Sequence, residues 1–376
     1  MASSRAKRIL HITGGMNRGG AETMIMNLYR KINKEEIQFD FVYFRKDACD
    51  YDDEIKQLGG NIYYICPPKI SNPLKFIVEL KRTISLNGPY YAVHAHTLYN
   101  IGLSLFASKL AGVNNRIAHA HSTQDMSAGS KTRVLYKGIM RFLINTNANY
   151  RVACGMQAGE FLFGSTFKND GIIIPNAIDL DMHMQENNEN IRELHSELAI
   201  DKNTLVIGQI GSLKDVKNYR FSIKLASALK KKGKKFHMLF VGDGELRDEL
   251  EDLVVKEELG EYISFLGVRE DIPNLMKIFD VLIMPSLFEG LPLTIIEAQA
   301  SGIPCVISNT ITKEADLGLG LVQFVDLESG LENWIEIICA SPSYRELNKK
   351  LIETTLQKKG YDILTGVEKL KRLYGL

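Results

Sequence analysis

Thirteen short apolar runs, separated by segments long enough for helices, constrain the fold of this chain more than any other feature. The runs lie at 8–13, 39–44, 62–65, 92–96, 116–121, 150–155, 171–175, 205–211, 236–242, 263–267, 280–286, 304–308 and 321–325. Runs with so little polar–apolar alternation are typical of strands buried on both faces of a parallel sheet. The segments between them fit right-handed helical crossovers. The sequence therefore predicts an α/β fold built on parallel sheets.

The length of 376 residues exceeds what one hydrophobic core comfortably fills, so we expect two domains. The strand–helix pattern restarts near residue 204, after the polar stretch 179–197. We therefore place the junction between the domains near 176–203. The last segment, 342–376, has a helical pattern and no strand, and by itself could pack on either domain.

Composition excludes several classes of protein. The formal net charge of +1 gives no overall field that would attract nucleic acid, so we expect no nucleic-acid partner. No apolar run approaches the ~18–20 residues that span a bilayer, and the N-terminus does not resemble a signal peptide. Five scattered cysteines without a C-x-x-C pair favour a reducing compartment over a disulfide framework or zinc ribbon. We expect a cytoplasmic protein.

A glycine-rich loop, "GGMNRGGAETMIMNLYR" (14–30), follows the first predicted strand. Its glycines include Gly15, Gly19 and Gly20, which let a backbone approach a ligand closely. Residues from Ala21 onward are predicted to be helical, and the free N–H groups of a helix start favour an anion. The spacing is not G-x-G-x-x-G. A tight strand-to-helix turn without a ligand explains the loop nearly as well.

Two predicted strands end in His-x-His, with His94 and His96 on one and His119 and His121 on the other. Residues two apart on a strand share a face, so we expect all four to project into one crevice. One of them could act as a general base or contact a sugar. Four imidazoles could also bind zinc, or the histidines could simply cap strand ends.

Two further loops follow strands in the second half. In "IGSLKDVKN" (210–218), Lys214 and Lys217 stand before a helix, an arrangement that suits a diphosphate but equally a solvated lysine pair. In "VGDGELRDEL" (241–250), Gly242 comes directly after a strand and a helix is predicted to begin at Glu245. The third glycine of a dinucleotide fingerprint is absent there, which weakens a nicotinamide interpretation.

The stretch "LFEGLPLTIIEAQASGIP" (287–304) contains two glutamates separated by seven residues. Pro292 favours a helix start and Gly302 a helix end, so Glu289 is predicted in the exit loop of a strand and Glu297 on the helix. A carboxylate can accept two hydrogen bonds from a vicinal diol. The free N–H groups between the two acids suit a phosphate; they belong to Gly290, Leu291 and Leu293. A glutamate at a helix start and a solvated glutamate on a helix would be the plain alternative.

The segment 131–144, "KTRVLYKGIMRFLI", places Arg133, Lys137 and Arg141 four residues apart on one helical face. The apolar residues beside them are Leu135, Ile139, Phe142 and Leu143. Such a helix suits anionic lipid or a polyprenyl-diphosphate acceptor at a membrane. An ordinary core helix with a solvated face fits at least as well.

These motifs together resemble glycosyltransferase family 4, the retaining GT-B enzymes, over nearly the whole chain. "EGLPLTIIEA" is similar to the family's E-x7-E motif. "GGMNRGGAE", "RIAHAHST", "IIIPNAID", "IGSLKDVKN", "VGDGELRDEL" and "FLGVREDIPNLMKIFDVLIMPS" occur in the family's order. The similarity is greatest to the capsular and exopolysaccharide branch. The resemblance implies two facing Rossmann-like, doubly wound domains with the active site in the cleft between them.

In that arrangement, residues 1–178 would bind the acceptor and 179–359 the nucleotide-sugar donor, and a C-terminal helix at about 360–376 would pack back on the first domain. Glu297 would bind the ribose hydroxyls and Glu289 the donor sugar, while Lys217 would neutralise the departing diphosphate. Val268 and Arg269 would lie near the base.

In the first domain, the resemblance implies that Gly19 and Gly20 close on the phosphates. His121 matches the family's strand-end histidine beside the donor sugar, and His119 is the second candidate. His121, Glu289 and Lys217 are thus the expected catalytic residues.

The resemblance implies a hexosyltransferase that moves a sugar from a nucleotide diphosphate sugar, most simply a UDP-sugar, to a saccharide or polyprenyl-linked acceptor in cell-surface polysaccharide synthesis. The acceptor would attack from the front face, and neither a metal nor another cofactor is expected. Peripheral contact with the inner face of the membrane would run through 131–144.

One position departs from the family pattern. Many relatives carry an arginine after the glycine at 211, whereas this chain has Ser212, with Lys214 as a possible substitute. An ammonium lacks the bidentate fork of a guanidinium, so we expect weaker diphosphate binding. A nucleotide-sugar-binding protein without transfer activity, an epimerase of the same fold and a metal-dependent hydrolase built on the histidines are the alternatives.

Overall fold

The computed structural model describes residues 6–68, 71–122, 125, 131–185, 188–201, 203–341 and 348–376. Within this part of the chain, all thirteen predicted strands are confirmed, and each end lies within two residues of its predicted position. The strands are β1 (Lys7–Ile12), β2 (Ile37–Tyr43), β3 (Ile62–Tyr64), β4 (Ala92–Ala95), β5 (Asn115–Ala120), β6 (Tyr150–Ala153), β7 (Ile172–Ile173), β8 (Leu205–Ile210), β9 (Phe236–Val241), β10 (Ile263–Gly267), β11 (Val281–Met284), β12 (Cys305–Ser308) and β13 (Val322–Val325). They form two separate parallel sheets, as the apolar runs indicated.

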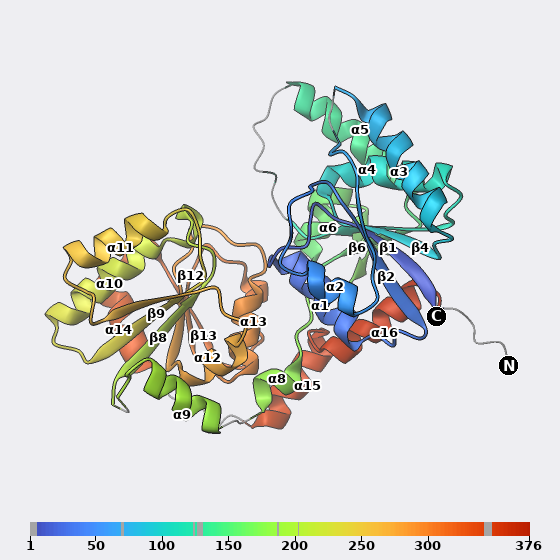
Figure 1. The fold of residues 1–376 in the computed structure, drawn as a ribbon. Helices are drawn as coiled ribbons and strands as arrows, with labels where there is room; N and C mark the ends of the chain where they lie inside the picture. Colours follow the sequence, from blue (N-terminus) through green and yellow to red (C-terminus); the bar gives the residue numbers. More distant parts are fainter. Residues whose placement is uncertain are drawn as a thin grey trace. The chain divides into compact units, whose positions relative to one another are not determined.

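The chain divides into two compact units, residues 1–178 with 360–376 and residues 179–359. Each unit is a sheet with helices on both faces, and Figure 1 shows the two sheets and their helices. The fold is therefore a pair of Rossmann-like doubly wound domains.

In the first unit, the described strands follow the order β3-β2-β1-β4-β5-β6-β7. One face of the sheet is covered by α3 (Pro73–Asn87), α4 (Ile101–Leu110), α5 (Lys131–Asn147) and α6 (Met156–Phe163). The other face is covered by α1 (Gly20–Lys31), α2 (Asp52–Gln57) and α16 (Ile363–Leu373). The short α7 (Phe167–Asp170) packs against α6. The order of strands reverses between β1 and β4, and open α/β sheets bind ligands at such a point, outside the carboxyl ends of the strands.

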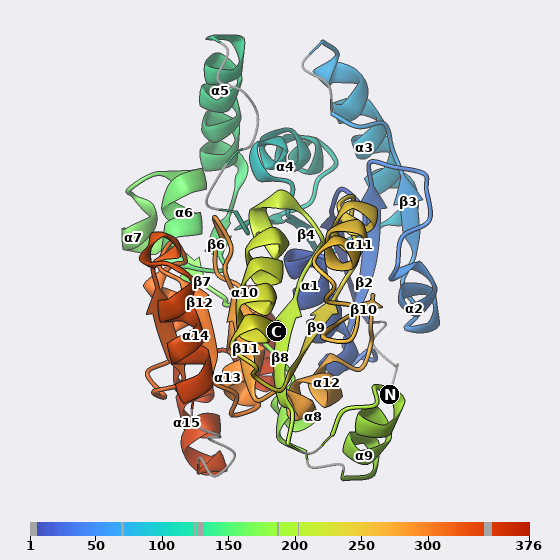
Figure 2. The same ribbon diagram turned by 90° about the vertical axis from the view of Figure 1, so that its left-hand side faces the viewer.

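In the second unit, the described strands follow the order β10-β9-β8-β11-β12-β13, with the reversal between β8 and β11. One face is covered by α10 (Tyr219–Lys231), α11 (Arg247–Lys256) and α14 (Leu331–Ala340). The other is covered by α9 (Asn188–Glu197), α12 (Ile272–Ile278) and α13 (Leu293–Ala300). The helices α8 (Leu180–Met184) and α15 (Lys349–Lys359) contact α13, and Figure 2 shows the unit from a second side.

The C-terminal helix α16 belongs to the first unit although the whole second unit separates it in sequence. Backbone hydrogen bonds join Ile178 to Tyr361 and Ile363 beside the first turn of α16. Gly366 lets α16 pack closely on α1, because a Cβ there would lie 3.2 Å from the Leu28 side chain. The last turn brings Tyr374 into the core of the first unit, fully buried.

Candidate functional site

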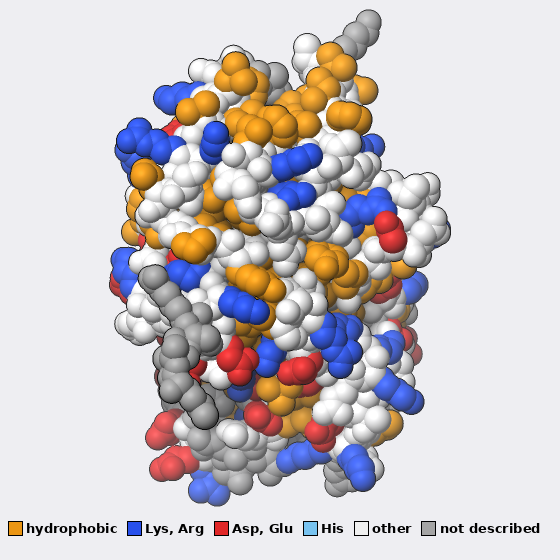
Figure 3. All heavy atoms as spheres, turned by 90° about the vertical axis from the view of Figure 1, so that its right-hand side faces the viewer, with side chains coloured by type: hydrophobic (Ala, Val, Ile, Leu, Met, Phe, Trp, Pro, Cys, Tyr) orange, Lys and Arg blue, Asp and Glu red, His pale blue; other side chains and the backbone are white. Residues whose placement is uncertain are grey.

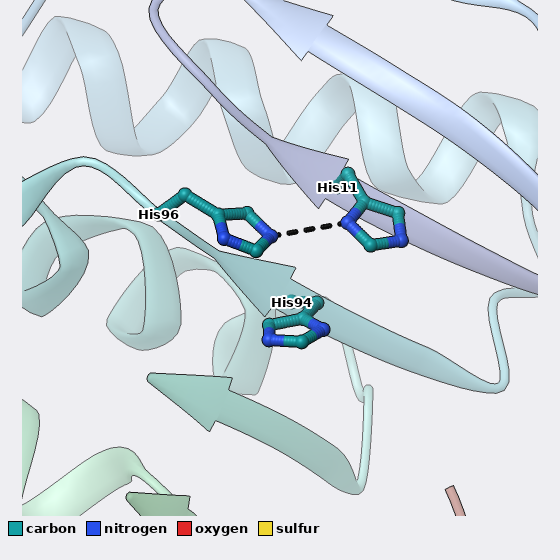
Figure 4. Close-up of side chains that lie close together, drawn as sticks. All are labelled: His11, His94 and His96. Atoms are coloured by element: carbon teal, nitrogen blue, oxygen red, sulfur yellow. Dashed lines mark hydrogen bonds between the residues drawn. The ribbon is translucent and has the colours of Figure 1, made fainter. Parts of the chain in front are cut away.

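Five histidines from three neighbouring strands share the sheet face that α1 and α16 cover. They are His11 on β1, His94 and His96 at β4, and His119 and His121 at β5. Along each strand the histidines alternate with residues that belong to the hydrophobic core on the other face of the sheet, which is why all five point the same way. Figure 4 shows His11 and His96 facing each other across the β1–β4 reversal, with His94 beside them. The four histidines do lie close together, and His11 joins them. The expectation that all four project into a crevice is wrong for His94 and His119, which lie within β4 and β5 and are 2% and 1% exposed.

Hydrogen bonds arrange these rings in two rows that cross the strands. In one row, His96 bonds to Nδ1 of His11 at 3.0 Å and to Nε2 of His121 at 2.9 Å. In the other, His94 bonds to the hydroxyl of Tyr374 at 2.9 Å and to Nδ1 of His119 at 3.1 Å. The rings of His119 and His121 stack with their centroids 4.0 Å apart, which joins the ends of the two rows.

Burial keeps these imidazoles neutral near pH 7. It lowers the pKa of His11 to about 3 and that of His121 to about 4, and it lowers the pKa values of the other three rings as well. Two groups of three nitrogens lie within 4.8 Å of one another, His11–His94–His96 and His96–His119–His121, a spacing that a transition metal can use. Both nitrogens of His96 and of His94 are already engaged in the rows.

Unpartnered polar atoms collect at the carboxyl end of the first sheet. Thr13 follows β1, Thr97 follows β4 and Asn176 follows β7, and each has a buried side-chain oxygen without a hydrogen-bond partner in the described chain. Nδ1 of His121 is in the same condition. Buried polar groups are nearly always paired in folded proteins, so these atoms can bind water or a ligand that carries hydroxyl or phosphate groups.

The glycine loop lies at this same edge, and its glycines serve packing as well as access. Gly19 caps α1, and a Cβ there would meet the carboxylate of Glu22 at 2.4 Å. A Cβ at Gly15 would meet Arg45 at 2.8 Å, whereas one at Gly20 would have only Asn176 nearby, at 4.0 Å. Burial raises the pKa of Glu22 and so favours the neutral form of its carboxyl group. Only the ionised form would repel an anion bound at this loop. Gly20 is therefore more open to a ligand than Gly15 or Gly19, and Gly14, with no atom within 4 Å of a Cβ, is open as well.

In the second unit, the loops after β8 and β11 meet at the strand reversal. Leu287 donates its N–H to the carbonyl of Val216 at 2.8 Å, and the Asn218 amide donates to the carbonyl of Pro285 at 3.0 Å. Asn218 adopts a left-handed conformation (φ 56°), which turns the chain from the short helix Asp215–Lys217 into α10. The two loops therefore hold each other in register.

This pairing brings Lys217 and Glu289 together. Nζ of Lys217 lies 2.5 Å from Oε1 of Glu289, which also accepts a hydrogen bond from the Ser286 hydroxyl at 2.8 Å. Both side chains are mostly buried, at 19% and 14% exposure. Two residues predicted to act on the donor thus form one ion pair.

Glu297 lies on α13, the helix that follows the loop of Glu289, and is partly buried. No hydrogen bond to its carboxylate occurs within the described residues, and burial raises its pKa to about 7. The helix is fixed by Gln299, which is fully buried and bonds to Ile295, Ala315 and Leu317. A carboxylate that is held rigidly and has no hydrogen-bond partner can accept hydrogen bonds from the hydroxyl groups of a ligand.

The loop between Glu289 and Glu297 has backbone N–H groups that are free to donate hydrogen bonds. In the described chain, no hydrogen bond uses the backbone N–H of Gly290, Leu291 or Leu293. Pro292 is the N-cap of α13, in agreement with a helix start near this proline, and Leu293 is the first helical residue. These N–H groups are the ones predicted to face a phosphate.

The other residues predicted to bind the nucleotide-sugar donor differ in their exposure and packing. Ser212 and Lys214 are exposed in the loop after β8. Gly242 has a packing role, because a Cβ there would lie 2.1 Å from the carbonyl oxygen of Gly211. Val268 is 61% exposed after β10, and Arg269 is held by Asp271 and Glu197.

Two sequence expectations need correction. The helix after Gly242 begins at Arg247, not at Glu245, because residues 242–246 form a turn that packs on Leu213. The second concerns α5, whose basic face was expected to meet either anionic lipid or solvent.

In the structure, the basic face of α5 is turned toward the protein. Arg133 and Lys137 form ion pairs with Asp125, at 3.2 and 2.8 Å. Arg141 donates to the carbonyl groups of Phe161 and Leu162. The outward residues are instead apolar; they are Val134, Leu135, Ile139 and Phe142, each 47–66% exposed.

Sequence reasoning did not find two members of the histidine rows. His11 carried a usable signal, because it is a histidine inside a predicted strand with the same alternation as the strand-end pairs. Tyr374 carried none, since nothing local links it to His94, 280 residues away in the chain.

Both halves of the chain match known families. Residues 18–182 match the family described as Glycosyltransferase Family 4, and residues 190–317 match Glycosyl transferases group 1. The chain is 42% identical to the putative glycosyltransferase EpsF of Bacillus subtilis, over 100% of this chain and 98% of that protein. It is 26% identical to the Escherichia coli UDP-Gal:alpha-D-GlcNAc-diphosphoundecaprenol alpha-1,3-galactosyltransferase, over 100% and 98% of the two chains.

Among solved structures, the chain resembles Anabaena Alr3699/HepE in complex with UDP and glucose. The TM-score is 0.78 at 20% identity, covering 98% of this chain and 100% of that one. The likeness shows that the two proteins share the two-domain fold.

Proposed function

The chain belongs to glycosyltransferase family 4, and we propose that it is a retaining enzyme that moves a sugar from a UDP-sugar to a saccharide or polyprenyl-diphosphate-linked acceptor. The observation that carries this proposal is the Lys217–Glu289 ion pair beside the free N–H groups of 290–293. A relative that uses UDP-Gal and a solved structure that contains UDP support the choice of base. A relative named as a capsular polysaccharide biosynthesis glycosyltransferase and another named for O-antigen biosynthesis support a role in cell-surface polysaccharide synthesis.

The second unit binds the donor in this proposal. Glu297 accepts hydrogen bonds from the ribose hydroxyls, because its carboxylate has no other partner. The N–H groups at the start of α13 and the ammonium of Lys217 bind the diphosphate, and Glu289 binds the sugar. The base lies near Val268 and Arg269. The first unit contributes His121 and the acceptor-binding surface.

The chemistry follows from charge development. As the bond between sugar and phosphate breaks toward an oxocarbenium-like state, negative charge grows on the diphosphate, and Lys217 with the helix N–H groups stabilises it. The acceptor attacks from the same face, and the leaving phosphate takes its proton. This scheme uses no protein nucleophile and no metal, so transfer is expected to continue in excess EDTA.

A panel of UDP-, GDP- and ADP-sugars tests donor binding by thermal stabilisation. A ligand at 100 times its dissociation constant adds about 2.7 kcal/mol to the free energy of unfolding. Glu297→Gln should lose the stabilisation, and Glu353→Gln, an exposed glutamate on α15, should keep it. The selected donor, radiolabelled, is then incubated with a synthetic polyprenyl-diphosphate-linked sugar.

Retention of configuration in the product, established by NMR of its anomeric proton, is the expected result. Binding without turnover would favour a nucleotide-sugar-binding protein, and conversion of the donor without an acceptor would favour an epimerase. Stabilisation by none of the nucleotide sugars would overturn the proposal.

The acceptor proposal includes peripheral contact with the inner face of the membrane through α5. None of the described helices is both long and apolar enough to cross a bilayer. The outward face of α5 is apolar, and α3, which like α5 packs on α4, adds exposed apolar residues, Leu74, Val78 and Leu86. Figure 3 shows hydrophobic side chains gathered at this end of the first unit. The exposed cations that would meet anionic lipid belong to α3; they are Lys75, Lys81 and Arg82.

Vesicle co-sedimentation checks this contact. We expect binding to vesicles that contain anionic lipid and about tenfold weaker binding to neutral ones. Leu135→Asn with Phe142→Asn should abolish sedimentation, whereas Val255→Asn on α11, equally apolar and 75% exposed, should not. Equal sedimentation of the α5 and α11 variants would show that the apolar face of α5 does not contact lipid.

A further inference from the structure

The row His11–His96–His121 has only two possible proton arrangements. Each neutral imidazole carries one N–H, and the two hydrogen bonds of the row use two of the three protons. The third proton must therefore lie at one end of the row, either on Nε2 of His11 or on Nδ1 of His121. Both of these nitrogens are buried and lack a partner in the described chain. The two ends are thus coupled, because a proton on one excludes a proton on the other.

The surroundings of His11 decide between the two arrangements. Its ring lies against Phe39 and Phe41, with centroids 4.2 and 5.5 Å away, and only 2% of the residue is exposed. An orphaned N–H in such an apolar environment is rarer than an orphaned acceptor. The proton is therefore placed on Nδ1 of His11, from which it is donated to His96. His96 in turn donates to Nε2 of His121, and Nδ1 of His121 carries the free N–H.

The second row has the same direction, for an independent reason. The Tyr374 hydroxyl is buried, and burial raises its pKa, so it keeps its proton. Nδ1 of His94 is its hydrogen-bond partner in the described chain, so the hydroxyl donates to that nitrogen. His94 then carries its proton on Nε2 and donates to Nδ1 of His119. The free N–H of this row lies on Nε2 of His119, which has no partner there either.

We propose that His11 and Tyr374 are positioning residues, which act through His96 and His94 to fix His121 and His119 as neutral N–H donors at the carboxyl end of β5. The inference rests on the proposed function for its ligand: the free N–H of His121 suits an oxygen atom of the donor sugar or of its phosphate, and His119, stacked on it, holds its ring in place. It also narrows the role of His121, which acts as a hydrogen-bond donor to the sugar and not as a general base.

The size-matched pair His11→Asn and His11→Leu separates this role from packing. The amide of Asn presents an N–H where Nδ1 of His11 does, so it can still donate to His96, whereas Leu cannot. In ¹⁵N-histidine-labelled protein, the two ring nitrogen shifts report which nitrogen of His121 is protonated, with His121→Gln identifying the signal. Tyr374→Phe makes the same test for His119, and Tyr29→Phe, which loses a partly buried hydrogen bond to Gln38, is its control.

We expect an Nδ1-protonated His121 in the native protein and in His11→Asn, and a mixture of tautomers in His11→Leu. Turnover of the UDP-sugar selected by the panel should fall in His11→Leu by the factor by which the Nδ1-protonated fraction of His121 falls, about twofold for an even mixture, with little change in His11→Asn. An Nε2-protonated or charged His121 at pH 7 in the native protein would overturn the proposal. So would stoichiometric zinc in the purified protein with both ring nitrogens shifted by coordination. The tautomer measurement needs no turnover, so failure of the proposed transfer activity would be seen separately.

Discussion

Lys217 and Glu289, 72 residues apart in the chain, form an ion pair of 2.5 Å at the point where the order of strands reverses in the second sheet. The cation proposed for the diphosphate is thus already bound to the carboxylate proposed for the sugar. When the donor binds, Lys217 must exchange Glu289 for the diphosphate, and Glu289 must exchange Lys217 for the sugar. The protein holds the two groups in position before the donor binds, which is a form of electrostatic preorganisation.

Removing the charge of Lys217 and removing that of Glu289 should therefore have different effects on turnover and on UDP binding. Lys217→Met is expected to lower kcat by about 10²–10³, because the charge that grows on the diphosphate loses its cation. Glu289→Gln is expected to lower turnover while UDP binds as well as before or several-fold more tightly, since Lys217 is left without its buried partner. Calorimetric titration with UDP and steady-state kinetics measure the two effects.

Ser286→Ala is the control for that experiment, because it removes the other hydrogen bond to Glu289 and leaves both charges in place. Its affinity for UDP should be unchanged. A Glu289→Gln variant that binds UDP much more weakly would contradict the exchange of partners.

Glu297 should destabilise the folded protein at neutral pH. Burial raises its pKa from 4.5 to about 7, so the folded state holds its proton more tightly than the unfolded state does. Stability contributed by the protonated form is present below pH 4.5 and is lost as the pH rises toward 7. Glu297→Gln is therefore expected to unfold with a free energy about 1–2 kcal/mol higher at pH 8 and nearly unchanged at pH 4.5. Urea denaturation at both pH values checks this, and a variant that gains nothing at pH 8 would contradict it.

The same carboxyl group should make donor binding release a proton. Ribose hydroxyls that donate to the ionised carboxylate favour the charged form and lower its pKa below 7. Titration at pH 6.5 with the UDP-sugar selected by the panel, whose diphosphate has no ionisation near this pH, should show a fractional proton released by the native protein in buffers of different ionisation enthalpy. Glu297→Gln should show none, if binding is still measurable at high concentration of the UDP-sugar. Proton uptake by the native protein would mean that Glu297 does not meet the ribose.

Ser212→Arg should strengthen diphosphate binding. Ser212 is exposed, so an arginine can extend from this position without disturbing the core. We expect a several-fold lower Kd for UDP at low salt, an effect that shrinks in 0.5 M NaCl because exposed charges are screened. Ser212→Met adds length without charge and should leave the Kd as it is. An unchanged Kd and unchanged turnover in Ser212→Arg would show that Lys214 and Lys217 already suffice.

The sequence by itself determined the architecture and the acidic half of the donor site. Strands buried on both faces leave apolar runs that can be recognised locally, so all thirteen were found to within two residues. Pro292 and Gly302 likewise mark the ends of α13 through backbone properties of their own, which fixed where Glu289 and Glu297 lie along the chain.

Only the tertiary structure decided which polar groups meet. Helical periodicity placed the basic residues of α5 on one face, but Asp125 and the carbonyl groups of Phe161 and Leu162 turned that face inward. The order β1–β4–β5 brought His11 beside His96, and the fold returned Tyr374 to His94. The physical reason is range: hydrophobic periodicity is a property of neighbouring residues, whereas a buried polar group is satisfied by whatever partner the folded chain brings to it.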